Sequence, residues 1–241
     1  MSFDREQWER KLARLAEVVE RRTLARIVAA LGDPPAFSNI PASLWSEIEE
    51  QYRNAIDQVF RDMYRAQAQS VAGSAAGTVD FTLTNEQAAR WARGYSFDLV
   101  KGMTDNLRAG LQSAISSFFT EQGTTTGDLT ARLQTLWGSK SRAEMIAITE
   151  VTRASEQAKQ DVEREIKQRN PAIDFDVFWE TDKDEYVCPI CRPLQGTKAA
   201  PGGQFVHPIT GATYEPPAHP RCRCRTRRVM VVRGKKAVEV G

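Results

Sequence analysis

Hydrophobic residues recur every three or four positions through roughly the first two thirds of the chain, and this spacing predicts long amphipathic helices. A first helix is predicted over about residues 4–31, ending at Gly32-Asp33-Pro34-Pro35. A second is predicted from Ser43 to the small-residue run that starts at Val71. The sequence Thr84-Asn-Glu-Gln87 has the form of a capping box, which predicts the start of a third helix that runs to about Thr120.

The pattern changes character after residue 170. Before it, a short helix capped by Asp128 is predicted, and a second capping box, Ser141-Arg-Ala-Glu144, opens a helix that Asn170-Pro171 ends. After it, residues 175–180 alternate as a strand, prolines and glycines become frequent, and residues 226–232 form a last β-rich stretch. We therefore expect an α+β fold with a mainly α-helical N-terminal region (1–125) and a C-terminal part (126–241) that carries a small β-rich module.

Composition excludes several classes of protein. The chain has 241 residues, of which 41% are hydrophobic and 27% charged, values usual for a soluble globular protein. The N-terminus has no basic region followed by an apolar run, and no segment is long and apolar enough to span a bilayer. We expect a protein that folds in a cytoplasm and does not contact a membrane.

All four cysteines lie between residues 188 and 224, which indicates a metal site. Cys188-Pro-Ile-Cys191 can offer two thiolates from one turn, and His219-Pro-Arg-Cys222-Arg-Cys224 offers further ligands. Thiolate sulfur favours zinc, and four protein ligands would leave no place for a reactive water, so the site is expected to be a structural zinc knuckle. His219, Cys222 and Cys224 are three candidates for two places. Two disulfides are the alternative, although a reducing cytosol disfavours them.

Two further polar residues have simpler expected roles. His207 is expected to lie partly exposed in a turn of a hairpin-like stretch. Glu150 precedes Arg153 by three residues on a predicted helix, a spacing that suits a surface ion pair worth a few tenths of a kcal/mol.

A basic stripe follows the cysteines, from Arg221 to Lys236, and it contains no acidic residue. Such a stripe can neutralise phosphates or face an acidic protein surface. The candidate nucleic-acid-binding residues are Arg225, Arg227, Arg228, Arg233, Lys235 and Lys236.

No catalytic residues are predicted. The chain lacks the His-x-Glu of zinc deaminases, a His-Glu-x-x-His helix, a Gly-x-Ser-x-Gly elbow and a phosphate-binding glycine loop. We expect a protein that is not an enzyme. The alternatives are a zinc-knuckle DNA-binding protein and, less favoured, a hydrolase or toxin-like enzyme that depends on the cysteines or a metal.

An ordered set of short sequence motifs, over roughly residues 129–232, resembles the Mu-type phage head morphogenesis family of minor capsid proteins. The motifs are Ile148-Thr-Glu150, Trp179-Glu-Thr-Asp182-Lys-Asp184, Val187-Cys-Pro-Ile-Cys191, Leu194-Gln-Gly196 and Pro216-Pro-Ala-His219-Pro-Arg-Cys222-Arg-Cys224. The resemblance implies a low-copy virion component at the portal vertex that assists head assembly or DNA packaging and ejection.

The resemblance also implies partners and a place. The portal protein is the expected partner of the N-terminal helices, and coat or scaffold protein, double-stranded DNA and a second copy of the chain are further candidates. The protein is expected in the phage head, and in the host cytoplasm during assembly. The resemblance further implies that Glu150 contacts the C-terminal module.

Overall fold

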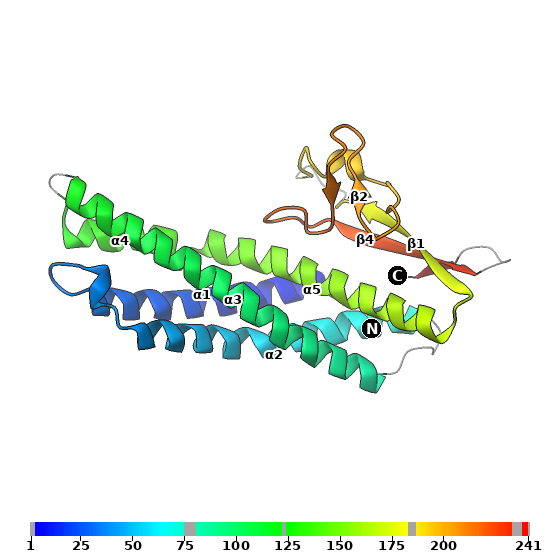
Figure 1. Cartoon of the computed structure of the whole chain (residues 1–241), viewed down its shortest axis with the longest axis horizontal. Coiled ribbons are helices and arrows are strands. Elements are labelled where there is room, and N and C mark those ends of the chain that lie inside the picture. The colour runs from blue at the N-terminus through cyan, green and yellow to red at the C-terminus, as the bar shows by residue number, and fades with distance from the viewer. Residues whose placement is uncertain (1–2, 75–80, 122–123, 183–186, 233–237, 241) are drawn as a thin grey trace. The chain divides into compact units, whose positions relative to one another are not determined.

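The computed structural model describes residues 3–74, 81–121, 124–182, 187–232 and 238–240, and it is mainly helical with a small C-terminal sheet region (Figure 1). The helices are α1 (Arg5–Leu31), α2 (Ala42–Ser74), α3 (Phe81–Thr120), α4 (Thr126–Leu136) and α5 (Lys140–Arg169). The strands are β1 (Ile173–Glu180), β2 (Phe205–Val206), β3 (Thr213–Tyr214), β4 (Arg225–Val232) and β5 (Val238–Val240). Single turns of 3-10 helix lie at Phe37–Asn39 and Arg192–Leu194. The predicted combination of long helices and a small C-terminal sheet is confirmed.

Helix starts differ from the prediction at two places. α3 begins at Phe81, so the predicted capping box at Thr84 is wrong and that residue lies inside the helix. α5 begins at Lys140, and the Arg142 N–H donates to the Ser139 hydroxyl at 3.2 Å, so the capping oxygen lies two residues before the predicted one.

The start of α4 carries a complete capping box. The Thr125 hydroxyl accepts from the Asp128 N–H at 3.2 Å, and the Asp128 carboxylate accepts from the Thr125 N–H at 2.8 Å. Asp128 is therefore the N3 residue of the box and not the predicted N-cap, which is Thr125.

The chain divides into two compact units, each assembled from separate segments. The helical unit comprises residues 9–60 and 90–147, and the sheet unit comprises residues 1–8, 61–89 and 148–241. The division into residues 1–125 and 126–241, drawn from the sequence, separates parts by their expected function and stays a prediction.

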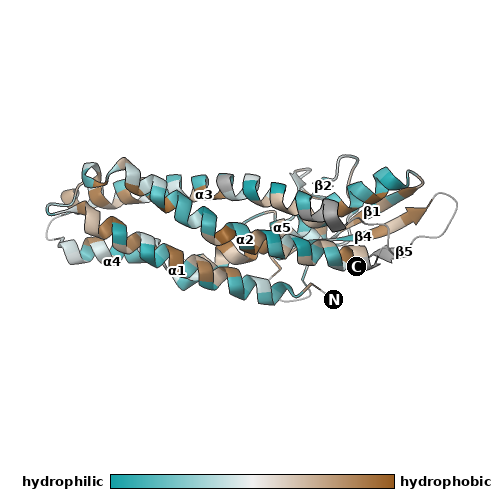
Figure 2. Ribbon diagram, turned by 90° about the horizontal axis from the view of Figure 1, so that it is seen from below, coloured by the Kyte–Doolittle hydropathy of each residue, from teal (hydrophilic) through white to brown (hydrophobic). Residues whose placement is uncertain are grey.

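The helical unit is held by apolar side chains that recur on one side of each helix, and Figure 2 shows hydrophobic and hydrophilic positions interleaved along the helices. The largest fully buried side chains of this unit are Leu12, Ile27, Ile48, Tyr52, Phe60, Leu107, Leu111 and Leu133. Phe60 contacts two aromatic rings, Trp91 at 5.8 Å and Tyr95 at 5.7 Å between centroids. This packing of aromatic and aliphatic side chains forms the core of the unit.

The sheet unit is built on an antiparallel sheet with the strand order β1-β4-β5. β1 and β4 pair along their whole length, from Ile173 opposite Val232 to Glu180 opposite Arg225. Figure 1 shows both strands beside α5, and side-chain contacts between β4 and α5 agree. The Ala199 N–H donates to the Val177 carbonyl at 2.8 Å, so the segment after the cysteine turn covers part of the free edge of β1.

No helix in the described part of the chain has the length and apolar character needed to cross a bilayer.

A matched pair of phenylalanines tests the core of the helical unit. Phe60 is 0% exposed, whereas Phe119 is 61% exposed. We expect Phe60→Ala to lower the free energy of unfolding by about 3–5 kcal/mol, because it removes aromatic contacts and leaves a cavity. Phe119→Ala is expected to change it by less than about 0.5 kcal/mol. Urea unfolding followed by circular dichroism measures both, and similar losses in the two variants would contradict the assignment of Phe60 to the core.

Candidate metal centre

The first ligand loop is a tight turn that aims two sulfurs the same way. The Cys191 N–H lies 3.1 Å from the Cys188 carbonyl, and the Arg192 N–H donates to the same carbonyl at 3.0 Å. The Cys191 N–H is also 3.3 Å from the Cys188 sulfur. Backbone donors directed at a sulfur stabilise its thiolate form. The turn then passes into the 3-10 helix Arg192–Leu194, which buries Leu194.

The second ligand loop is a turn from His219 to Cys222. The Cys222 N–H donates to the His219 carbonyl at 3.1 Å, which closes the turn. Pro220 and Arg221 are its central residues, and Arg221 has a positive φ of 65°. Proline followed by a residue with positive φ is the signature of a type II turn. The geometry brings the ligand atoms of His219 and Cys222 close to the first loop.

All five predicted ligand residues converge, in two overlapping groups. Cys188, Cys191 and His219 form one group and Cys191, Cys222 and Cys224 the other, and within each group the ligand atoms lie within 4.8 Å of one another. The Cys191 and Cys222 sulfurs are 3.8 Å apart. A tetrahedral zinc ion with bonds of about 2.3 Å to sulfur separates two ligand sulfurs by roughly 3.8 Å. The four cysteines are free in the structure, so the disulfide alternative is not supported.

His219 is oriented as a metal-ligating histidine usually is. Its Nδ1 lies 2.8 Å from the Pro220 carbonyl oxygen, which can only accept, so Nδ1 carries a proton. In the neutral ring, the lone pair is then on Nε2. That nitrogen lies 3.0 Å from the Cys188 sulfur and 3.3 Å from the Cys191 sulfur. A backbone carbonyl that fixes the far nitrogen is the common second-shell arrangement at zinc sites.

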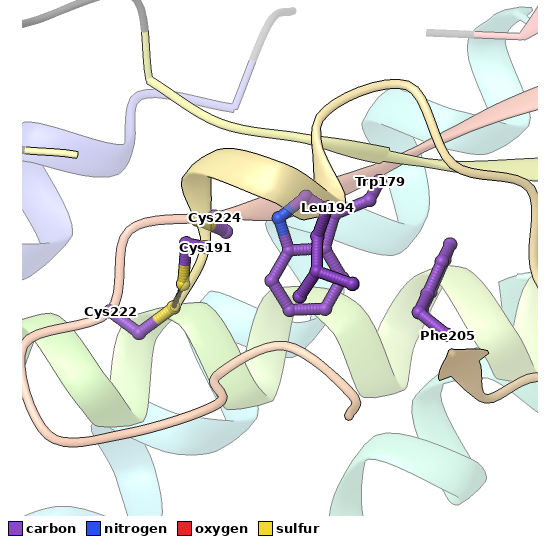
Figure 3. Packing of buried hydrophobic residues seen from close by; sticks show 6 residues of the cluster. All are labelled: Trp179, Cys191, Leu194, Phe205, Cys222 and Cys224. Atoms are coloured by element: carbon purple, nitrogen blue, oxygen red, sulfur yellow. Dashed lines mark hydrogen bonds between the residues drawn. The ribbon is translucent and has the colours of Figure 1, made fainter. Parts of the chain in front are cut away.

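A buried indole supports a negative charge at the cluster. Trp179 is 1% exposed and packs edge to face against Phe205 with 5.2 Å between ring centroids. Figure 3 shows its indole nitrogen on the side of Cys224. The hydrogen bond with Cys191 lowers the pKa of the Cys224 thiol, but the hydrogen bond with Cys222 and burial raise it further, so the pKa is raised overall and the indole N–H opposes that rise. The same nitrogen has no conventional hydrogen-bond partner among the described residues. A thiolate at Cys224 is the acceptor that would satisfy it.

Without a bound metal ion, the tendency to form a thiolate differs strongly among the sulfurs of the cluster. The thiols of Cys191 and Cys224 donate to Cys222 and lower its pKa to about 2, which outweighs its burial. Hydrogen bonding to Cys222 and burial raise the pKa of Cys191. Burial opposes a charged His219, but the Pro220 carbonyl and the thiolates of Cys222 and Cys188 raise its pKa. Without a metal, protons thus remain on several of the ligand atoms. A bound cation would displace these protons and leave the ligands in their metal-binding forms.

The residues present fit a zinc ion held by four ligands. Cys191 belongs to both groups and is a ligand of either set. A site of Cys188, Cys191, His219 and Cys222 uses the shortest observed separations, whereas an all-cysteine site uses the sulfur that Trp179 supports. A zinc ion there would be closed to substrate and would cross-link the two loops.

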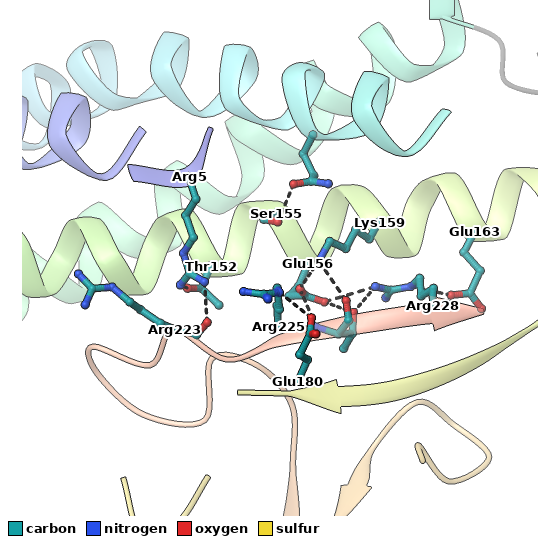
Figure 4. A network of polar contacts seen from close by, with 12 residues as sticks. Arg5, Thr152, Ser155, Glu156, Lys159, Glu163, Glu180, Arg223, Arg225 and Arg228 are labelled. Atoms are coloured by element: carbon teal, nitrogen blue, oxygen red, sulfur yellow. Dashed lines mark hydrogen bonds and ion pairs between the residues drawn. The ribbon is translucent and has the colours of Figure 1, made fainter. Parts of the chain in front are cut away.

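Helix α5 anchors the second loop through two threonines. The Arg221 N–H donates to the Thr149 hydroxyl at 2.9 Å, and the Thr152 hydroxyl lies 2.9 Å from the Cys222 carbonyl. Arg5, at the start of α1, donates to the Thr152 hydroxyl and to the Arg223 carbonyl, as Figure 4 shows. The metal loop is therefore fixed to the helix that precedes the sheet.

A buried carboxylate binds β4 to the same helix. Glu156 is 3% exposed, and its carboxylate accepts from both the backbone N–H and the hydroxyl of Thr226. Lys159 and Arg228 also contact it, and Arg228 pairs with Glu163 at 2.9 Å (Figure 4). Lys159, Glu156 and Arg228 are charged residues that sequence patterning assigns to solvent, so no signal in the hydrophobic spacing identified this network.

Arg225 and Arg227, two of the predicted DNA-binding residues, have contacts within the protein. Arg225 donates to Glu180 at 2.7 Å and to Asp182 at 3.0 Å. The Arg227 guanidinium lies 4.8 Å from the centre of the Phe178 ring, its cross-strand neighbour.

Arg228 does not fit the predicted role in phosphate binding. It is 5% exposed and faces α5, where the carboxylates of Glu156 and Glu163 hold it. The alternation of side chains along a strand explains the error, because every second residue of β4 points inward and Arg228 lies on the same buried face as Thr226. The remaining candidates, Arg233, Lys235 and Lys236, lie outside the described residues.

His207 and Glu150 are also more buried than expected. His207 is 5% exposed, not a partly exposed turn residue, and its Nδ1 accepts from the N–H groups of Ile209 and Thr210 at 3.2 Å each. It is thus a structural residue of the β2–β3 hairpin. Glu150 is 5% exposed and lies 3.6 Å from Arg153, so the predicted ion pair forms, but its carboxylate is not on the surface.

Zinc content tests the metal centre. We expect the purified chain to retain one zinc ion and Cys191→Ser to lose it, because both ligand groups need this sulfur. Comparison of His219→Ala with Cys224→Ser identifies the set, since the two candidate sets differ only in these residues and the larger loss of zinc marks the ligand. Lowering the pH should release the ion, because protons compete for the same atoms. Elemental analysis after dialysis measures all three variants, and undiminished zinc in Cys191→Ser would contradict the site.

The anchoring of the ligand loop is tested by Thr152→Val, which removes the contacts of this hydroxyl with Cys222 and Arg5. We expect a loss of about 1–2 kcal/mol in the free energy of unfolding. The Thr152 hydroxyl also donates to the Ile148 carbonyl, four residues earlier, at 2.9 Å. The control is Thr135→Val, because Thr135 makes the same kind of contact with the Ala131 carbonyl at 3.0 Å but is exposed. That change should cost less than about 0.5 kcal/mol in the same urea titration. Equal losses would mean that the contact with the loop adds nothing.

The comparison with protein families identifies the region that contains this site. Residues 114–227 match the model of a family described as Phage Mu protein F like protein. The matched segment is a little under half of the chain and includes α4, α5, β1 and both ligand loops. No curated protein and no solved structure gives a significant match to the chain. Residues 114–227 are thus similar to the Phage Mu protein F like family, and this match supports the Mu-type phage head morphogenesis family that the sequence motifs predicted.

Proposed function

We propose that this protein is a minor capsid component of a phage head, present in few copies, that associates with the portal vertex and assists head assembly or DNA packaging and ejection. The observation that carries the proposal is the family match over residues 114–227, which contains the complete set of candidate metal ligands up to Cys224. The family supports the role in head morphogenesis. The place at the portal and the low copy number are our extension of it.

The metal centre acts in this proposal as a structural cross-link. A zinc ion joins the loop after β1 to the loop before β4, and the contacts of Thr149 and Thr152 join the second loop to α5. The C-terminal loops would then present a fixed surface to the partner in the assembling head. The helices of residues 1–125 supply the contacts with the portal protein or with further copies of the chain.

Catalysis has no part in this proposal. Four protein ligands leave zinc no open position for an activated water, which a hydrolytic site requires. A nucleic-acid-binding role outside a virion is the weaker alternative. Arg228 is buried and Arg225 pairs with two carboxylates, so the stripe offers fewer phosphate contacts than its sequence indicated.

Analysis of phage heads tests the role. The phage that encodes the chain is grown with a tagged copy and with a depleted one, and purified heads are examined by quantitative mass spectrometry. We expect a few copies per head, co-purification with the portal ring, and a loss of infectious particles on depletion.

The metal-binding variant adds a second arm. Cys188→Ser combined with Cys191→Ser should reduce incorporation into heads, whereas Thr135→Val, an exposed change on α4, should be incorporated normally. Heads that assemble, package DNA and infect normally without the chain would rule the proposal out.

A further inference from the structure

The β2–β3 hairpin carries the most exposed large hydrophobic side chain that the structure describes. Ile209, in the turn of this hairpin, is 79% exposed, and Val206 on β2 is 47% exposed. The stretch around them, residues 199–214, contains no aspartate, glutamate, lysine or arginine, although 27% of the whole chain is charged. A single exposed isoleucine is usual on a protein surface, and what sets Ile209 apart is how its turn is held.

The base of the hairpin is fixed to the core of the sheet unit. Phe205, on β2, is 1% exposed and packs edge to face against Trp179, as Figure 3 shows. The ring of His207, which is 5% exposed, lies 6.0 Å from the ring of Tyr214 on β3. The inward side chains of Phe205 and His207 leave Val206, between them, facing solvent. Buried contacts therefore set the direction in which the hairpin projects.

Two backbone hydrogen bonds close the turn of the hairpin, whose tip comprises residues 207–212. The His207 N–H donates to the Ala212 carbonyl at 2.8 Å. The Gly211 N–H donates to the His207 carbonyl at 2.9 Å. Gly211 has a φ of 71°, a left-handed conformation that glycine adopts without the strain that a side chain would bring. The sequence of the tip thus suits one defined backbone conformation.

The remaining N–H groups of the tip are also engaged inside it. The N–H groups of Ile209 and Thr210 donate to the ring of His207, at 3.2 Å each. The Ala212 N–H donates to the Thr210 hydroxyl at 3.3 Å, and Pro208 has no N–H to donate. A backbone held in this way before a partner arrives lowers the entropic cost of binding. With its backbone donors engaged, the tip presents the side chain of Ile209 as its largest group in solvent.

These features decide which kind of partner the tip fits. Nucleic acid and other phosphates need basic side chains or free N–H donors, and the tip offers neither. A partner strand pairs with unbonded backbone groups, and the N–H groups of the tip are already bonded. Stable anchoring to a membrane takes a second signal, such as a basic patch, and residues 199–214 contain none. An apolar pocket of another protein remains, and the cores of protein interfaces are depleted of charged residues.

We propose that Ile209 is a docking residue that inserts into an apolar pocket of another protein of the phage head. His207 is the positioning residue, because its buried ring accepts from the two N–H groups that orient the turn. The exposed, uncharged residues of the hairpin surround the contact. This inference rests on the proposed function for the identity of the partner, whereas the chemistry of the contact follows from the hairpin itself.

Site-specific photo-crosslinking in infected cells tests the contact. The phage that encodes the chain is grown in cells that supply the full-length chain with Ile209→p-benzoylphenylalanine, and mass spectrometry identifies the adducts after irradiation. We expect an adduct with another protein of the head. The control is Gln168→p-benzoylphenylalanine, at an exposed residue of α5 in the sheet unit, which should give no adduct with that protein.

Two substitutions at the same position measure the contribution of the side chain. Ile209→Ser removes the apolar surface and should weaken binding of the purified chain to the crosslinked protein by about tenfold or more. Ile209→Leu keeps that surface and should bind within about twofold of the parent chain. Because the side chain is 79% exposed, both variants should unfold at the same urea concentration as the parent.

The outcomes separate this inference from the proposed function. The inference is overturned if position 209 gives no protein adduct, if its adducts are only with lipid, DNA or a second copy of the chain, or if Ile209→Ser binds as tightly as Ile209→Leu. A chain that enters heads without an adduct at position 209 contradicts the inference alone. An adduct with a protein that is not part of the head keeps the docking role of Ile209 and contradicts the proposed function.

Discussion

One buried carboxylate, that of Glu156, determines where the sheet lies against the helix that precedes it. A buried charge is tolerated only when its hydrogen-bonding capacity is met, and Glu156 meets it with Thr226, Lys159 and Arg228. Thr226 is the second residue of β4, so the register of this strand against α5 follows from the contact. β1 then takes its place by pairing with β4, and the cysteine loops take theirs because one follows β1 and the other leads into β4.

The sequence was sufficient to identify the elements but not the network that orders them. Periodicity identified α1, α2 and α5, and it placed β1 and β4 to within two residues, because long runs of regular spacing are strong signals. Helix starts were less certain, since Thr84 and Ser141 match a capping box although the capping oxygens lie elsewhere. The buried position of Arg228 escaped prediction because a basic stripe looks the same whether alternate residues face solvent or a carboxylate.

The candidate metal centre was almost completely predictable, because its ligands are recognised by residue type and spacing. The structure brings the five predicted residues together and adds what spacing cannot show. The position of Cys191 in both ligand groups and the indole N–H beside Cys224 depend on contacts between residues distant in sequence. The ring of His219 is instead oriented by the carbonyl of the next residue, Pro220. His207 shows the opposite case, because only the folded hairpin reveals that its buried ring accepts hydrogen bonds from the backbone of an exposed turn.

The turn between His219 and Cys222 has a consequence for how the ligand loop keeps its shape. Arg221 adopts a left-handed backbone conformation, which costs an arginine roughly 1 kcal/mol or more that a glycine would not incur. A turn of this kind relaxes unless both of its ends are fixed. Thr149 fixes the backbone at its centre, and a metal bound by His219 and Cys222 would clamp the residues on either side. The folded loop then retains backbone strain at Arg221, and the metal would keep the turn in this strained conformation by holding the residues on either side of it.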